Sequence, residues 1–152
     1  MTLSQLKIIY SKKDKMHNWQ HILKLKRTVA ILRKPYKKIN QDLLDFITYF
    51  HGAKDYLKDN LSDFNKDYVK SLLRHNKKPK LIEEKLVFDA NMLTNVGKQG
   101  LKKALYVGKT LNRSKEDTYK FIKQNLKKAK FYTKIGKEIG KKEIKILKDL
   151  IK

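Results

Sequence analysis

The stretch WQHILKLKRTVAIL, residues 19–32, carries the clearest structural signal in this sequence. Apolar residues recur in it at intervals of three, four and three positions, and they are Ile22, Leu25, Val29 and Leu32. This spacing puts them on one face of an α-helix, because the helix repeats every 3.6 residues. We therefore predict one or two helices over residues 3–32, ended by Pro35.

The same helical spacing continues along the rest of the chain, and no segment alternates with a period of two. Helices are expected over residues 40–60, 65–76, 81–95 and 101–112, then from Ser114 through Tyr132, and finally to the C-terminus. Asn40 and Ser114 are suitable helix N-caps, and Gly136 and Gly140 are expected to bracket a kink or turn. The sequence therefore predicts an all-α protein, a helical bundle over residues 39–152 with a basic N-terminal helical arm over 1–38 and a basic C-terminal helix.

Composition excludes several classes of protein. The chain has 152 residues, which fits one domain, or one domain and an arm. It contains no cysteine, so disulfides, thiolate zinc sites and thiol catalysis are excluded. No apolar run is long enough for a membrane span, and residues 1–15 lack the pattern of a secretory signal. We expect no membrane span and no secretion through a signal peptide.

Positive charge is concentrated at the two ends of the chain. The formal net charge is +23. Residues 1–38 hold eleven Lys or Arg and one acidic residue, residues 97–152 hold eighteen and five, and residues 39–96 hold nine of each. Such an excess at both ends, with a neutral middle, favours contact with a polyanion. Lysine dominates over arginine, which favours contacts to phosphates that do not depend on base sequence.

Three groups of basic residues are candidate phosphate contacts. The N-terminal cluster is Lys24, Lys26, Arg27, Arg33, Lys34, Lys37 and Lys38. The first helical ladder is Lys120, Lys123, Lys127, Lys130 and Lys134, and the second is Lys137, Lys141, Lys145, Lys148 and Lys152. Like charges four residues apart destabilise a helix unless an anion lies beside them, which favours bound phosphate. The alternative is that each ladder is an ordinary helix face exposed to solvent.

The sequence shows no pattern that requires catalysis. His17 and His21 stand four residues apart and have no third metal ligand nearby, while His51 and His75 are single in the sequence. No phosphate-binding loop and no arrangement of nucleophile and base is present. We therefore expect no catalytic residues, no metal, no cofactor and no enzymatic activity.

Short motifs resemble a known family. Leu111-Asn112-Arg113 and residues 126–132, LKKAKFY, are similar to two elements of the major coat proteins of rod-shaped and filamentous viruses of hyperthermophilic archaea. Trp19 and Thr28-Val29-Ala30 follow the N-terminal order of that family. The resemblance implies a helical bundle whose N-terminal helical arm wraps double-stranded DNA, and subunits that assemble into a helical virion.

These observations lead to a functional hypothesis with two alternatives. The main hypothesis is sequence-independent binding and packaging of nucleic acid, with duplex DNA favoured over RNA, by a nucleocapsid or coat subunit in a virion. Its partners would be DNA and either further copies of the chain or a paralogous coat subunit. The alternatives are a cytoplasmic RNA-binding or ribosome-associated protein and, third, a small basic nuclease.

Overall fold

The computed structural model describes residues 3–152, and within them it confirms the all-α prediction. This part of the chain contains nine α-helices, one short 3-10 helix and no strand. The α-helices are α1 (Leu3–Ser11), α2 (Trp19–Leu32), α3 (Gln41–Phe50), α4 (Lys54–Asp59), α5 (Lys66–His75), α6 (Ile82–Leu93), α7 (Gly97–Thr110), α8 (Lys115–Leu126) and α9 (Lys134–Leu150). None of these described helices is both long and apolar enough to cross a membrane.

The chain divides into two compact units within α6. The first unit ends at Phe88 and the second is Asp89–Lys152. The prediction placed a boundary after residue 38, between an arm and a bundle. In the structure α1 and α2 belong to the first unit, because their apolar side chains are buried in its core. The strong helical periodicity of the basic N-terminal segment therefore reflects burial in that core.

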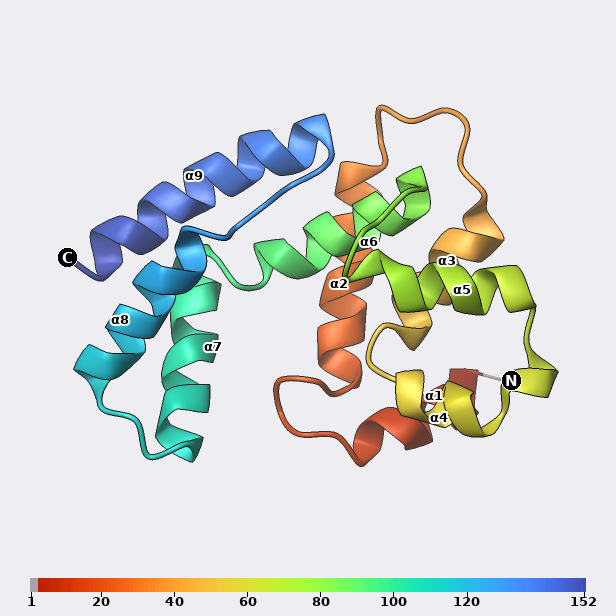
Figure 1. Cartoon of the computed structure of the whole chain (residues 1–152), viewed down its shortest axis with the longest axis horizontal. Helices are drawn as coiled ribbons and strands as arrows, with labels where there is room; N and C mark the ends of the chain where they lie inside the picture. The colour runs from red at the N-terminus through yellow and green to blue at the C-terminus, as the bar shows by residue number, and fades with distance from the viewer. Residues whose placement is uncertain (1–2) are drawn as a thin grey trace. The chain divides into compact units, whose positions relative to one another are not determined.

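In the first unit, α2 packs against α1 and α3, and α5 packs against α3 and α4 (Figure 1). Tyr10 of α1 is fully buried and its hydroxyl donates to the carbonyl of Tyr49 at 2.6 Å. The amide of Gly52 in turn donates to that hydroxyl at 3.2 Å. A Cβ atom at residue 52 would lie 3.1 Å from the Tyr10 ring, so glycine permits this close approach. This contact fixes α1 against the end of α3.

The predicted helix over residues 40–60 is interrupted. Asn40 caps α3 as expected, by accepting from the amide of Leu43 at 3.0 Å. However, α3 ends at Phe50 and α4 begins at Lys54, because the chain turns at residues 51–53 where Gly52 meets Tyr10. This turn places His51 at the C-terminal end of α3.

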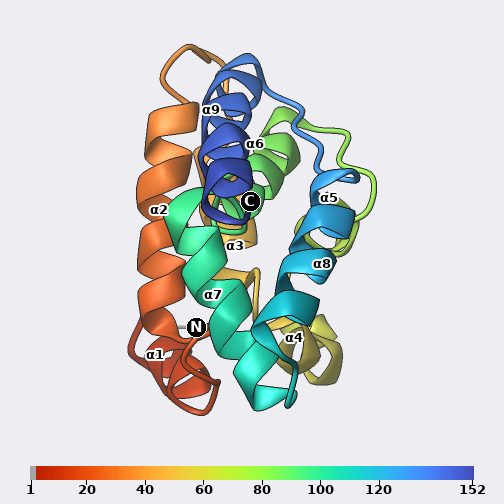
Figure 2. The same ribbon diagram turned by 90° about the vertical axis from the view of Figure 1, so that its left-hand side faces the viewer.

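In the second unit, α7 packs against both α8 and α9 (Figure 2). A core of Ile122, Leu147 and Ile151 joins α8 to α9, and half-buried residues of α7 pack against it. Six lysines and three acidic residues of α9 make it the basic C-terminal helix that the sequence predicted.

The prediction of one helix from Ser114 through Tyr132 is wrong. Ser114 caps α8, accepting from the amide of Asp117 at 3.0 Å, but the helix ends at Leu126. A new helix, α9, begins at Lys134, and Thr133 caps it. Gly136 and Gly140 lie inside α9 and do not bracket a kink. Asp89 and Thr133 pack directly against Gly136, and the ring of Phe131 packs against Gly140, so neither position has room for a side chain.

Three acidic side chains of α6 are buried, and each accepts a hydrogen bond from a backbone amide. Glu83 accepts from the amide of Asn40 at 2.7 Å. Glu84 accepts from the amide of Lys80 at 2.7 Å and from Nε of Arg74 at 3.0 Å. Buried carboxylates are stable only when they are paired or hydrogen-bonded, so these bonds fix the segments that donate them.

The third buried acidic residue of α6, Asp89, lies in the second unit. Its carboxylate accepts from the amide of Tyr132 at 2.8 Å, the amide of Thr133 at 2.7 Å and the hydroxyl of Thr133 at 2.7 Å. The Thr133 hydroxyl then accepts from the amide of Gly136 at 3.0 Å. Asp89 therefore determines where α9 begins.

We predict that Asp89→Ala lowers the free energy of unfolding by about 3 kcal/mol, because it leaves buried amides without an acceptor. Urea denaturation followed by circular dichroism measures this loss. The control is Asp149→Ala, which removes an exposed acidic residue of α9 and leaves the stability almost unchanged. An equal loss in the two variants would contradict the assignment of Asp89.

Candidate functional site

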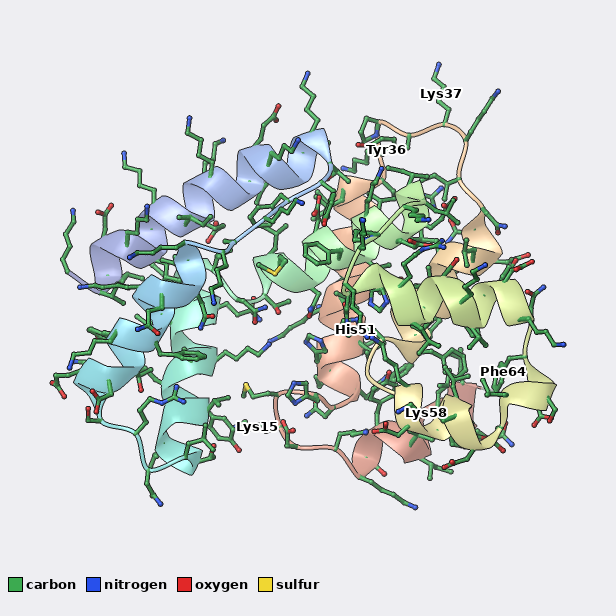
Figure 3. All side chains as sticks on the ribbon, in the orientation of Figure 1. Lys15, Tyr36, Lys37, His51, Lys58 and Phe64 are labelled. Atoms are coloured by element: carbon green, nitrogen blue, oxygen red, sulfur yellow. The ribbon has the colours of Figure 1, made fainter. Side chains whose placement is uncertain are left out.

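The predicted N-terminal cluster is a set of separate side chains in the first unit. Those exposed to solvent are Lys24, Lys26, Arg27, Lys34, Lys37 and Lys38. Arg33 is half-buried and donates to Gln41. Lys26 lies 4.7 Å from the centroid of the Tyr49 ring and donates to its hydroxyl, which raises the pKa of Lys26. Figure 3 shows Lys37 on the loop between α2 and α3, pointing away from the ribbon.

The first predicted ladder is not one continuous stripe, because the chain leaves the helix after Leu126. Lys120 pairs with Asp117 on α8 at 3.4 Å, and Lys130 lies in the connecting segment with Nζ 4.8 Å from the centroid of the Tyr132 ring. Lys134 starts α9. Lys123 and Lys127, by contrast, come close to the end of α9.

The second predicted ladder lies on α9, and its lysines line two shallow hollows of the second unit. The first hollow, of about 430 Å³, is lined by Phe131, Lys137, Lys141, Ile144, Lys145 and Lys148. The second, of about 380 Å³, is lined by Lys123, Leu126, Lys127, Lys148, Ile151 and Lys152. We call the seven lysines of these two hollows the basic face. Lys148 belongs to both hollows, so the two ladders meet there.

A second candidate site lies in the first unit, where four histidines from different segments form a row. His17 precedes α2, His21 lies on α2, His51 follows α3, and His75 ends α5. Consecutive ring centroids lie 6.2, 5.9 and 5.2 Å apart. The side chain of His17 is 53% exposed, whereas His75 is fully buried. This histidine row therefore runs from the surface into the core.

Hydrogen bonds fix the proton positions at the buried end of the row. Nδ1 of His75 contacts the carbonyl of Leu72, which can only accept, so Nδ1 carries a proton. Burial lowers the pKa of His75 to about 4, so the ring is neutral at pH 7. Its Nε2 must then accept the hydrogen bond from Nδ1 of His51, at 2.9 Å. At the outer end, Nδ1 of His17 contacts Asp14 at 2.7 Å.

Charged groups stand beside the buried end of the row. The positive charge of Lys54 also lowers the pKa of His75, while Glu84 acts in the opposite direction. Burial, and then the charge of Lys77, lower the pKa of Lys54 itself. Burial alone would raise the pKa of Glu84, but hydrogen bonds from Arg74 and the Lys80 amide hold it below its ordinary value.

The row supplies imidazole nitrogens that can donate, accept or transfer protons, with an ammonium group nearby. Within residues 3–152, no group of three or more His, Asp or Glu side chains has the arrangement of a metal site. Sequence reasoning considered His17 and His21 as a pair and treated His51 and His75 as isolated. Only their separation along the chain concealed the row, since all four histidines of the protein belong to it.

Comparisons with known proteins identify the fold but no family. No protein-family model and no curated protein matches the chain. It is similar to the crystal structure of Lin1889 from Listeria innocua. The TM-score is 0.73 and the identity 23%, over 98% of this chain and 90% of that one. It is also similar to YpgQ from Bacillus subtilis, crystallised in complex with ADP. There the TM-score is 0.74 and the identity 13%, over 97% of this chain and 88% of that one.

The YpgQ structure corrects one expectation from the sequence. Basic composition and the absence of a familiar motif led to the prediction that the chain is not an enzyme. That prediction was wrong, because this helical fold also occurs in a protein that holds ADP. Neither similar structure concerns viral coat proteins or DNA packaging, so the coat hypothesis and the virion location stay predictions.

We predict that His75 makes the folded protein less stable in mild acid. The unfolded chain takes up a proton at this residue near pH 6.5, whereas the folded chain does so near pH 4. The unfolded state therefore binds more protons between these values, and stability is lost as the pH falls through this window. The loss is about 1.4 kcal/mol per pH unit once the unfolded imidazole is protonated. Urea denaturation at pH 7, 6 and 5 measures it.

His75→Gln provides the comparison, because glutamine keeps a donor and an acceptor and does not titrate. The variant should show a shallower loss of stability between pH 7 and pH 5 than the parent protein. The same loss in both proteins would assign the effect to other groups.

Proposed function

We propose that this protein binds a nucleotide through its phosphate groups at the histidine row of the first unit. The observation that carries the proposal is the row itself, in which four imidazoles contact one another in succession and Lys54 acts on the ring at its buried end. Support from outside the chain comes from YpgQ, a protein of similar fold that was crystallised with ADP.

The chemistry of the row suits an anionic phosphate. The Nδ1 proton of His51 is already donated to His75, so His51 donates to a phosphate oxygen only through Nε2 of its protonated ring. Hydrogen bonds to phosphate from a protonated imidazole and from the lysine ammonium are charge-assisted. His21 and His51 are half-buried, so a bound phosphate would lose part of its hydration there and interact more strongly with these donors.

The position of Lys54 adds a second argument. It begins α4 directly after the turn that holds His51, and it is half-buried. Burial and the nearby charge of Lys77 disfavour its ammonium form, as the lowered pKa shows. A phosphate beside Lys54 would stabilise its ammonium form against burial and against repulsion from Lys77. Relief of this destabilisation would contribute to the free energy of binding.

We predict that ADP binds to the full-length protein and that His51→Gln and Lys54→Gln each weaken binding about tenfold or more, equivalent to about 1.4 kcal/mol. Isothermal titration calorimetry measures the dissociation constants. The matched control is Lys58→Gln, which removes an exposed lysine one turn further along α4 and should change the affinity less than twofold.

Chemical shifts of the imidazole protons give an independent reading of the site. Addition of ADP should shift the imidazole signals of His21 and His51 and leave the backbone amide signals of the second unit in place. Failure of the parent protein to bind ADP, or equal affinity in all three variants, would overturn the proposal.

A further inference from the structure

The basic face of the second unit carries an inference that is independent of the nucleotide proposal. Its seven lysines are Lys123, Lys127, Lys137, Lys141, Lys145, Lys148 and Lys152, and all are exposed. No acidic side chain lines either of the two described hollows. Of the three acidic residues of α9, Glu138, Glu143 and Asp149, the last pairs with Lys152 at 2.6 Å.

We propose that the basic face binds the phosphate backbone of duplex DNA, without reading its sequence. The lysines from 137 to 148 extend over about 16 Å of helix α9, at 1.5 Å per residue. Duplex DNA carries one negative charge for about every 1.7 Å of its axis, so a duplex of this length carries about ten phosphates on its two strands. An excess of phosphates over lysines allows each ammonium to find a partner.

The way the lysines are brought together supports a binding surface rather than an ordinary solvated helix. Lys123 and Lys127 come from the end of α8, and Lys148 and Lys152 come from the end of the chain. The buried core of Ile122, Leu147 and Ile151 holds these two segments together. Tertiary packing therefore places like charges close to one another, at an electrostatic cost that bound phosphates would offset.

The residues of the two hollows other than lysine add no group for base recognition. Besides lysine, the lining consists of Phe131, Ile144, Leu126 and Ile151, none of which can read a base edge or a 2′-hydroxyl by hydrogen bonding. The ring of Phe131 packs against Gly140 of α9, so it is not presented for stacking on an unpaired base. This composition favours contact with a phosphate backbone over contact with bases.

A membrane surface fits this face less well than DNA. Peripheral helices insert protruding apolar side chains into the lipid. Here the apolar residues form the floor of the hollows, half-buried or buried, and the lysines are the exposed groups. The exposed apolar residues of α9, Ile146 and Leu150, line neither hollow, so the lysines are the groups that protrude around the hollows.

The test is binding of full-length protein to a fluorescent 30-base-pair DNA duplex, followed by anisotropy from 50 to 200 mM NaCl. One variant is Lys137→Gln, Lys141→Gln and Lys145→Gln together. The matched control is Lys66→Gln, Lys70→Gln and Lys78→Gln, three exposed lysines of the first unit. Both triple variants lower the net charge by three, so they differ only in where the charge is lost. Thermal melting followed by circular dichroism confirms that both are folded.

We expect the affinity of the parent protein to fall by roughly four orders of magnitude over this salt range if all seven lysines contact phosphates. The slope of log affinity against log salt should become less steep by roughly 2.7 in the α9 variant, since each lost contact removes about 0.9. The control should keep the slope of the parent.

Three results would overturn the proposal. Equal weakening in both triple variants would show that only total charge matters. Tighter binding to a structured RNA of equal length would assign the face to RNA. Binding to vesicles of anionic lipid at a salt concentration that abolishes DNA binding would assign it to a membrane surface.

Discussion

The burial of acidic side chains on α6 is the constraint on which the described structure depends. Glu83, Glu84 and Asp89 are all removed from solvent in a chain that carries a large positive charge. A buried carboxylate without partners is strongly destabilising, so each must be surrounded by donors. Backbone amides of Asn40, Lys80, Tyr132 and Thr133 supply most of them. The acidic side chains of α6 thereby fix the starts of α3 and α9, and also the segment at Lys80 that leads into α6.

Both candidate sites follow from these bonds. Glu84 holds Arg74, the residue before His75, and so fixes the end of α5 where the buried end of the histidine row lies. Asp89 fixes Thr133, which caps α9, and so sets which residues of that helix face the core and which carry the exposed lysines. The two candidate sites lie in different units, and the two proposals rest on different groups, imidazoles and one half-buried lysine in the first unit and a dense array of exposed lysines in the second.

The similarity to a protein crystallised with ADP changes how the composition of the chain is interpreted. Lysine enrichment and a missing catalytic motif pointed to a passive packaging protein, and that interpretation gave the histidines no role. A fold that holds a nucleotide elsewhere makes the meeting of four imidazoles the more informative feature. Both proposals involve binding to phosphate groups. For the basic face, the distribution of charge along the sequence already favoured such binding.

The sequence by itself determined the all-α class, the positions of most helices and their caps at Asn40 and Ser114, because helical periodicity and capping are local properties. It also determined that lysines would recur along the last helix, α9. The tertiary structure decided where helices break, since the turn at Gly52 depends on Tyr10, forty-two residues away, and the start of α9 depends on Asp89, forty-four residues from Thr133. It alone assembled the histidine row, because contact between residues distant along the chain is created by packing and leaves no periodic signal in the sequence.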